Sequence, residues 1–222
     1  MNFRQDLQNQ LISIMSRFEE TIESSREGIV SRETQNNYLY EQIEELQCSL
    51  NKAEEEKSID YLTGVLTRRA YNIELKKVEE HFKTFDSNYA IIFYDLDHFK
   101  KINDNYGHDC GDSILSTFSS ILNKLTRTED IISRYGGEEF ISIVHYSNQQ
   151  EIENYLKRVK NIITSNRFVY GDVKINVEFC AGVAFRENYT SYTEAVKTAD
   201  TLLYKAKDEG RNKIVLDSNL IF

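Results

Sequence analysis

The 222-residue sequence predicts an α+β domain of the ferredoxin-like type, a mixed sheet flanked by helices, preceded by a helical coiled-coil segment. Two observations predict it. From residue 58 onward, apolar strands alternate with helical periodicity in the order α-β-α-β-β-α-β-α-β, which contains the β-α-β-β-α-β core of that architecture. Residues 1–57 instead contain many Glu, Gln and Arg residues, one Gly and few β-branched residues. We therefore predict two parts, residues 1–57 and 58–222.

Residues 1–57 carry coiled-coil spacing in two places. The segment is acidic, with six basic and twelve acidic side chains. Apolar residues recur at intervals of four and three in two sets, Leu7, Leu11, Ile14 and Phe18, and then Leu39, Ile43, Leu46, Leu50 and Ala53. The sets are out of phase across a polar stretch at residues 24–37, so we expect two helices, or one helix with a stutter. We interpret the segment as an oligomerisation stalk or a partner-binding segment; the alternative is an amphipathic helix that lies on its own domain.

The first half of the domain shows alternating helix and strand signals. Residues 67–85 repeat apolar side chains at helical spacing. The near-continuous apolar run at residues 89–95 predicts a strand that is buried on both faces. Helical spacing returns at residues 114–125. Short strands are then predicted at residues 131–134 and 140–145, because two glycines separate them as in a hairpin.

The second half repeats the alternation. Residues 151–165 predict a helix, and residues 173–185 predict one long strand or a pair of strands. A helix follows at residues 192–207, and Gly210 ends it at the C′ position. Residues 214–216 predict a last strand at the edge of the sheet.

Composition excludes several classes of protein. The net charge of −9 is unfavourable for binding a nucleic-acid backbone. No run of about 18 apolar residues predicts a membrane span, and the first ten residues lack the apolar core of a signal peptide. Cys48, Cys110 and Cys180 are far apart and odd in number, which argues against a disulfide framework or a thiolate zinc site. We expect a cytoplasmic protein that binds neither nucleic acid nor membrane.

Four carboxylates are predicted to converge at one end of the sheet. Asp95 and Asp97 end the buried strand, and Glu138 and Glu139 follow the two glycines of the hairpin. Pairing of the two strands would bring Asp95 and Glu138 together, and such carboxylates repel one another unless a cation compensates them. Oxygen ligands without His or Cys favour Mg²⁺ or Mn²⁺. The alternative interpretation is a solvated hairpin tip.

The segment after Asp97 is suited to a phosphate-bearing ligand. The chain leaves a strand and enters a helix there, so backbone N–H groups point toward the carboxylates, and Lys100 adds a positive charge. Asn103 and Asp112 are suited to a guanine edge, because an amide can meet O6 and N7 while a carboxylate accepts from N1–H and the N2 amino group. Lys207 and Arg211 lie four residues apart and could reach the same phosphates, although such a pair is usually a surface feature.

Together these motifs resemble the GGDEF family of diguanylate cyclases, which join two GTP molecules into cyclic di-GMP. The resemblance covers about residues 59–216 and implies a nucleotidyl-cyclase-type fold. Five motifs stand in the family order: Asp60 to Arg69 (DYLTGVLTRR), Asp95 to Lys100 (DLDHFK), Asn103 to Asp112 (NDNYGHDCGD), Gly136 to Phe140 (GGEEF) and Ala199 to Asn212 (ADTLLYKAKDEGRN). Thr67 and Val65 depart from the family pattern, outside the metal and phosphate positions.

The resemblance implies roles for the matched residues. Asp95, the Leu96 carbonyl and Glu138 would ligate Mg²⁺ or Mn²⁺. Glu138 and Glu139 would be catalytic, with Glu139 either helping to deprotonate the attacking hydroxyl or taking part in a second metal site. The residues that would bind GTP are Lys100, Lys207 and Arg211 at the phosphates, Asn103 and Asp112 at the guanine, and His108 in the nucleotide pocket. The role of Asp97 is left open.

Arg127 and Asp130 stand at the spacing of the family's RxxD inhibitory site. By resemblance, Arg127 would contact the phosphate and guanine of bound cyclic di-GMP, and Asp130 would contact its guanine. A lone RxxD is a common accident, but this one keeps the family offset before the two glycines, so we favour a product site.

The implied reaction is attack by the ribose 3′-OH of one GTP on the α-phosphate of another. Each site holds one GTP, so two subunits must face each other as a homodimer, and residues 1–57 would bring them together or bind a regulatory protein. Two alternatives remain: a catalytically silent receptor for GTP or cyclic di-GMP that signals through its helices, and a coiled-coil adaptor whose globular domain is structural. An enzyme making a mixed guanine–adenine product is disfavoured by Asp112.

Overall fold

The computed structural model describes residues 13, 15–20, 40, 42, 58–85, 87–165, 167–218 and 221. The chain divides into two units, Met1–Glu55 and Glu56–Phe222. Of the apolar residues in the two predicted coiled-coil sets, the structure describes Phe18, which lies in a helical stretch and is exposed. The other members lie outside the described residues, so the coiled coil stays a prediction.

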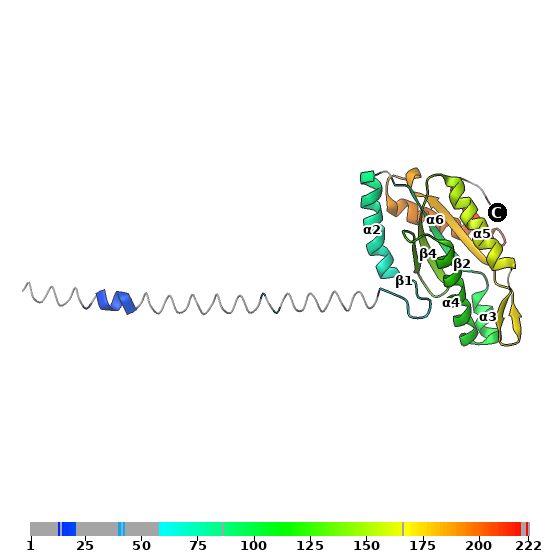
Figure 1. The fold of residues 1–222 in the computed structure, drawn as a ribbon, viewed down its shortest axis with the longest axis horizontal. Helices are drawn as coiled ribbons and strands as arrows, with labels where there is room; N and C mark the ends of the chain where they lie inside the picture. Colours follow the sequence, from blue (N-terminus) through cyan, green and yellow to red (C-terminus); the bar gives the residue numbers. More distant parts are fainter. Residues whose placement is uncertain are drawn as a thin grey trace, which may run out of the picture. The chain divides into compact units, whose positions relative to one another are not determined.

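The second unit alternates strands and helices as its sequence predicts (Figure 1). Its elements are β1 (Leu66–Thr67), α2 (Arg68–Phe85), β2 (Tyr89–Leu96), α3 (Phe99–Tyr106), α4 (His108–Leu125), β3 (Ile131–Arg134), β4 (Glu139–His145), α5 (Gln149–Ser165), β5 (Phe168–Tyr170), β6 (Val173–Ile175), β7 (Phe179–Phe185), the 3₁₀ turn η1 (Arg186–Asn188), α6 (Tyr192–Asp208) and β8 (Ile214–Leu216).

Two predicted elements differ in the structure, and three short elements, β1, β5 and η1, were not predicted. The helix expected at residues 114–125 begins at His108, because the polar residues before it form its first turn. The stretch 173–185 is a strand pair divided between two sheets: β6 pairs with β5 in a separate hairpin, while β7 lies in the main sheet.

The main sheet has the strand order β1-β3-β4-β2-β7-β8. The central strand β2 pairs antiparallel with β4 and with β7, and all eight of its residues are buried. This placement explains why its sequence is continuously apolar rather than alternating. The outer pairs β1–β3 and β7–β8 are parallel, so the mixed sheet and the edge position of β8 are confirmed.

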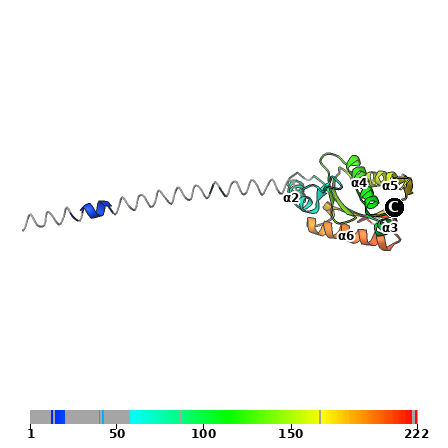
Figure 2. The same cartoon turned by 90° about the horizontal axis from the view of Figure 1, so that it is seen from below.

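Helices cover both faces of the sheet, and alternate residues of β2 enter two cores. Figure 2 shows α4 and α5 on one side of the sheet and α6 on the other. Ile92 and Tyr94 pack in the core that contains Phe118 of α4. Ile91 and Phe93 pack in the second core with side chains from α2 and α6. This period of two is the pleat of a strand buried on both faces.

The packing of α6 on the sheet depends on one glycine of β7. A Cβ atom added to Gly182 would lie 2.1 Å from the carbonyl oxygen of Ala199 and 2.2 Å from the backbone nitrogen of Leu203. The backbone of helix α6 therefore packs directly against the backbone of β7 at this position. This contact sets the height of α6 above the sheet, and with it the position of the residues at its C-terminal end.

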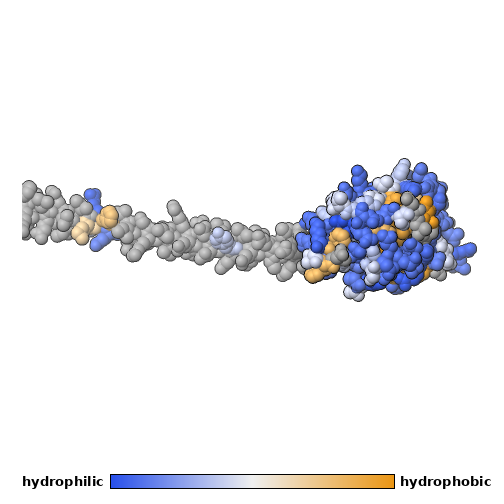
Figure 3. Space-filling model, turned by 90° about the horizontal axis from the view of Figure 1, so that it is seen from above, coloured by the Kyte–Doolittle hydropathy of each residue, from blue (hydrophilic) through white to orange (hydrophobic). Residues whose placement is uncertain are grey.

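The surface of the second unit is predominantly polar on the side drawn in Figure 3, where hydrophilic residues surround small hydrophobic patches. Within the described part of the chain, no helix has both the length and the apolar character needed to span a membrane.

Candidate active site

The predicted carboxylates meet at one end of the central strands. Asp95, the seventh residue of β2, faces Glu139 of β4 across the sheet, and the backbone N–H of Leu96 donates to the carbonyl of Glu138 at 3.4 Å. Asp95 is buried, whereas Glu138 and Glu139 are half-buried at the hairpin. The strand pairing expected from the sequence therefore places these acidic residues on neighbouring strand ends.

The charges of this cluster are incompletely compensated. Burial, with the negative charges of Glu139 and Asp97, raises the pKa of Asp95 against the opposing effect of Lys207. Burial, followed by repulsion from Asp95 and Glu139, also raises the pKa of Glu138. Raised pKa values in two neighbouring carboxyls mean that additional positive charge would stabilise their ionised forms.

This donor set fits a hard divalent cation. The expected ligands are two carboxylates and one backbone carbonyl, all oxygen atoms, and Mg²⁺ or Mn²⁺ prefers such ligands. Among the residues that the structure describes, no group of three or more His, Cys, Asp or Glu side chains is arranged to hold a metal ion. The predicted set contains two such side chains, so water or substrate oxygens would have to complete the coordination.

Lys207 lies in this cluster. Its Nζ is 2.7 Å from Oδ2 of Asp95, and it comes from the last turn of α6. The sequence predicts Lys207 as a phosphate contact, and the structure places it against a predicted metal ligand. In this position the Lys207 ammonium group can compensate the charge of the Asp95 carboxylate and also contact an anion that approaches from the solvent.

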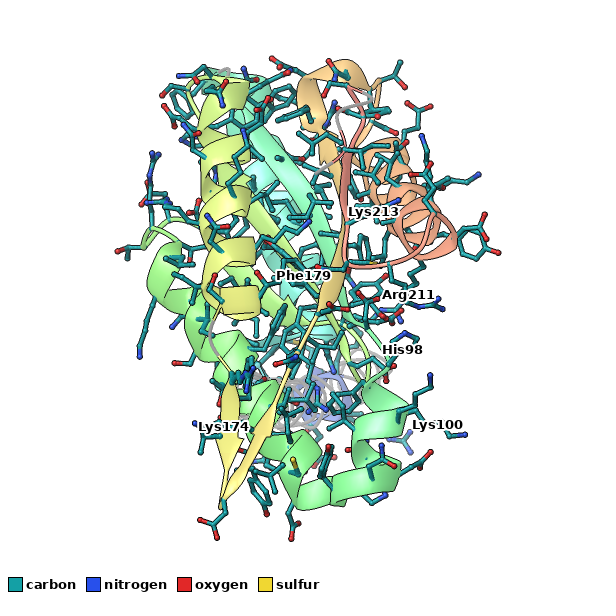
Figure 4. All side chains as sticks on the ribbon, turned by 90° about the vertical axis from the view of Figure 1, so that its right-hand side faces the viewer. His98, Lys100, Lys174, Phe179, Arg211 and Lys213 are labelled. Atoms are coloured by element: carbon teal, nitrogen blue, oxygen red, sulfur yellow. The ribbon has the colours of Figure 1, made fainter. Side chains whose placement is uncertain are left out.

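Arg211 follows α6 in a tight turn. Helix α6 ends in a Schellman motif, in which Gly210 has φ +108° and the backbone N–H of Arg211 donates to the carbonyl of Ala206 at 3.2 Å. Figure 4 shows Arg211, His98 and Lys100 along one edge of the domain. Lys100 and Arg211 are both exposed. The predicted phosphate-binding cations thus come from α3 and from the end of α6.

The predicted guanine-binding residues lie where α3 meets α4. A Cβ atom on Gly111 would lie 1.9 Å from Oδ1 of Asn103, so the amide of Asn103 is packed against the first turn of α4. That Oδ1 atom is buried and has no hydrogen-bond partner within the described structure. Asp112, the next residue after Gly111, is exposed, as is His108 at the start of α4. An unpartnered buried acceptor beside an exposed carboxylate suits a ligand that brings its own donors.

The carboxylate of Asp97 has different partners from the carboxylate of Asp95. It is 5% exposed, and its carboxylate accepts hydrogen bonds from the Cys180 thiol at 3.2 Å and from the backbone N–H of Asn212 at 2.8 Å. The second acidic residue of the Asp-x-Asp motif therefore bonds to protein groups. Neither partner is identifiable from the sequence, because both lie more than 80 residues away.

The predicted inhibitory residues line a separate cavity of about 310 Å³. Oδ2 of Asp130 accepts from the backbone N–H of Arg127 at 2.8 Å, and Oδ1 accepts from the backbone N–H of His145 at 2.9 Å. Burial would raise the pKa of Asp130, but the bonds from His145 and Arg127 outweigh it and lower the pKa. Arg127 also pairs with Glu151 at 3.2 Å.

The same cavity contains residues that the sequence reasoning missed. His145 comes from β4, while Glu151, Tyr155 and Arg158 come from α5. The α5 residues are spaced by four and three and therefore share one helix face. That spacing was available as a signal, but without the fold nothing placed this face opposite Arg127.

A further missed contact supports the hairpin. Asp60 accepts from the backbone N–H of Thr63 at 3.0 Å and pairs with Arg134 at 3.2 Å. Arg134 also donates to the carbonyl of Gly137 through Nε at 3.1 Å and Nη2 at 2.9 Å. The beginning of the domain is thereby tied to the turn that carries Glu138.

Comparison with known proteins gives the same assignment. Residues 57–213 match the family model described as "Diguanylate cyclase, GGDEF domain". The chain is 34% identical over 147 residues to diguanylate cyclase A of Treponema denticola. The matched residues cover 63% of this chain and 40% of that protein. It is 33% identical over 159 residues to the uncharacterized protein YhcK of Bacillus subtilis, covering 70% and 44%. The chain thus spans less than half the length of either relative.

Solved structures extend the likeness. Diguanylate cyclase SiaD of Pseudomonas aeruginosa, in complex with its activator SiaC, superposes with a TM-score of 0.68 at 28% identity, over 96% of this chain and 80% of that chain. The coiled coil and GGDEF domain of DgcB from Caulobacter crescentus, in complex with c-di-GMP, gives a TM-score of 0.70 at 23% identity, over 84% and 99%, and supports the fold alone. With the family model matching most of the chain, the protein belongs to the GGDEF domain family of diguanylate cyclases.

Proposed function

We propose that the chain is an active diguanylate cyclase that condenses two GTP molecules into cyclic di-GMP and pyrophosphate. The observation that carries the proposal is the buried Asp95 beside Glu138, two carboxyls whose pKa values are raised by burial and by mutual repulsion. A domain without catalytic function gains no stability from such a pair. Both residues nevertheless stand at the positions expected of metal ligands.

GTP would lie between α3 and the end of α6. Asn103 and Asp112 would bind the donor edge of guanine, with His108 beside the nucleotide, because the N1–H and amino groups suit the Asp112 carboxylate and the buried, unpartnered Oδ1 of Asn103. Lys100, Lys207 and Arg211 would bind the phosphates (Figure 4). Adenine lacks the adjacent N1–H and amino donors that a carboxylate accepts from, so Asp112 favours guanine.

Asp95, the Leu96 carbonyl and Glu138 would hold Mg²⁺ or Mn²⁺. Bound there, the ion supplies positive charge that lowers the pKa of the attacking hydroxyl and offsets charge on the leaving group. Glu139, which stands opposite Asp95 on β4, would accept the proton of the 3′-OH. Lys207, which contacts Asp95 at 2.7 Å, would compensate the charge of the departing pyrophosphate.

Two copies of the domain are required, since one site reads one guanine and the product contains two equivalent phosphodiester bonds. Residues 1–57 would hold the copies as a cytoplasmic homodimer or bind a regulatory protein. The likeness to SiaD, which was crystallised with an activator, supports the regulatory alternative. The cavity at Arg127 and Asp130 would bind cyclic di-GMP as an inhibitor, with Glu151 displaced from Arg127.

The test is to incubate the purified chain with GTP and Mg²⁺ and to identify the nucleotide product by mass spectrometry. Cyclic di-GMP with release of pyrophosphate is expected, and Glu138→Gln serves as the matched inactive control. Binding of GTP or cyclic di-GMP by calorimetry without any turnover would instead favour the silent receptor. Turnover of ATP at the same rate as GTP would overturn the assignment of the guanine site.

A further inference from the structure

The turn after α6 has an unusual backbone. Gly210, Arg211 and Asn212 have φ values of +108°, +64° and +48°, so three consecutive residues occupy the left-handed half of the φ range. Glycine adopts this region freely, but a residue with a Cβ atom does so at an energetic cost and persists there when its surroundings hold it. The conformation of Arg211 is therefore set by its contacts.

Asp97 makes the central contacts with this turn. Its Oδ2 accepts from the backbone N–H of Asn212 at 2.8 Å, and its Oδ1 lies 4.0 Å from Nε of Arg211. The Cys180 thiol donates to the same carboxylate at 3.2 Å from the neighbouring strand β7. Because the Asp97 side chain is almost completely buried, its geometry is fixed by the end of β2.

Two further side chains hold Asn212 from other elements. Nζ of Lys160, on α5, donates to the carbonyl of Asn212 at 3.0 Å. The side-chain amide of Asn212 donates to Oε1 of Glu178 at 3.2 Å. The backbone N–H, the backbone carbonyl and the side chain of Asn212 are thus each bonded to a different part of the domain. This residue is the anchored end of the turn that presents Arg211.

We propose that Asp97 is a positioning residue of the reaction: its carboxylate holds the left-handed turn at Asn212 and thereby places the guanidinium of Arg211 against the substrate phosphates. The inference rests on the proposed function, in which Arg211 binds GTP. Asp95 is in β2 and Asp97 follows directly after its last residue, so one short stretch of chain would position both the metal-binding carboxylate and the turn that carries Arg211. Asp97 acts through the turn and does not itself contact the substrate.

The experiment compares GTP affinity, measured by calorimetry on the full chain with Mg²⁺, with KM, kcat and thermal unfolding. Asp97→Ala should raise the Kd and KM for GTP about tenfold and change kcat much less, because it misplaces a group that binds substrate and transition state alike. Asp97→Asn keeps an oxygen that can accept the Asn212 N–H and should recover part of the loss. Asp208→Asn is the matched control, since it removes one exposed charge at the end of α6 and should leave affinity unchanged.

A double-mutant cycle separates positioning from a general structural role. If Asp97 acts through Arg211, then Asp97→Ala should weaken GTP binding less than twofold further in an Arg211→Ala background. Equal losses in both backgrounds, or an Asp97→Ala protein with wild-type affinity, would overturn the proposal. A wild-type chain that binds GTP but makes no product would refute the proposed activity, and the binding cycle would still decide the role of Asp97.

Lys160→Met provides a second route if Asp97→Ala does not fold. It removes the donor to the Asn212 carbonyl from outside the substrate site while keeping a side chain of similar length. A rise in the Kd for GTP of threefold or more, absent from Lys157→Met one turn earlier on α5, supports the anchored turn. An unchanged Kd in folded Lys160→Met, together with loss of fold in Asp97→Ala, would show that Asp97 serves stability and would refute the positioning role.

Discussion

Replacing Gly111 with Ala should separate nucleotide recognition from stability. The new Cβ atom would lie 1.9 Å from Oδ1 of Asn103, whereas ordinary van der Waals contact begins at 3.4 Å. The Asn103 amide must therefore move by about 1.5 Å, and a hydrogen bond of about 2.9 Å does not survive such a shift. The added Cβ would also lie 3.0 Å from the ring of Phe99, a buried core side chain, so the Asn103 side chain and the Phe99 ring must both shift.

Loss of this hydrogen bond leaves a guanine group unpaired at a buried position, which costs about 1–3 kcal/mol. The KM and Kd for GTP should accordingly rise by about 5- to 150-fold. The free energy of unfolding should change little, because the preference of a helix for Ala over Gly, about 0.5–1 kcal/mol, opposes the cost of shifting the buried Phe99 ring. Gly111→Ala should therefore unfold near the wild-type temperature while binding GTP poorly.

The assay is GTP binding by calorimetry combined with thermal unfolding. Ser113→Ala, an exposed change two residues further along α4, is the control and should leave GTP affinity unchanged. Asn103→Ala should reproduce the loss, and the double variant should lose no more than Asn103→Ala alone. Wild-type affinity in Gly111→Ala would refute the role of the Asn103 amide in reading guanine.

Three other predictions concern different parts of the domain. Glu138→Gln should lower cyclic di-GMP formation at least about 100-fold in a GTP and Mg²⁺ assay, and thermal unfolding should not occur earlier, because a carboxylate with a raised pKa has been removed; a rate near wild type would contradict the metal assignment. Arg127→Ala should convert more GTP before the progress curve flattens, and the same plateau in both proteins would argue against product inhibition. Glu79→Gln should lower the free energy of unfolding by about 3 kcal/mol, because it replaces the anionic partner of the buried Arg186 guanidinium, now at 2.7 Å, with a neutral amide. Burial raises the pKa of Glu79, but its bonds to Arg186 and Tyr89 outweigh this and lower it from 4.5, so the difference from wild type should fade as urea unfolding is measured at pH values falling below about 4.5. The control is Glu74→Gln, which removes a partly exposed partner of Lys77, and a pH-independent difference in the Glu79 variant would contradict the ion-pair explanation.

Much of the fold was predictable because its signals are local. The apolar run of β2 indicated a strand buried on both faces, and the structure places it at the centre of the sheet. The two glycines of the hairpin indicated the turn between β3 and β4. The division of residues 173–185 between two sheets could not be predicted, since the choice of partner strand depends on contacts distant in sequence.

The candidate site divides in the same way. The grouping of Asp95 with the hairpin glutamates follows from strand order, which the motif order implied. The pairing of Lys207 with Asp95 and the bonds of Asp97 to Asn212 and Cys180 join residues more than 80 positions apart. Neither the periodicity nor the composition of the sequence predicts contacts between residues so far apart. The resemblance therefore predicted which residues belong to the candidate site, while the geometry indicates how the contacts of Asp97 differ from those of Asp95.

The glycine under α6 limits how the proposed activity could be controlled. At Gly182, helix α6 meets β7 backbone to backbone, with no side chain between them at that point. Rotamer changes in the core therefore have little leverage on the spacing between Lys207 and the strand end that bears Asp95. A regulator cannot readily loosen or tighten one half of the reaction centre by tilting this helix. We therefore expect regulation to change how often two copies of the domain associate, and not the internal geometry of either copy.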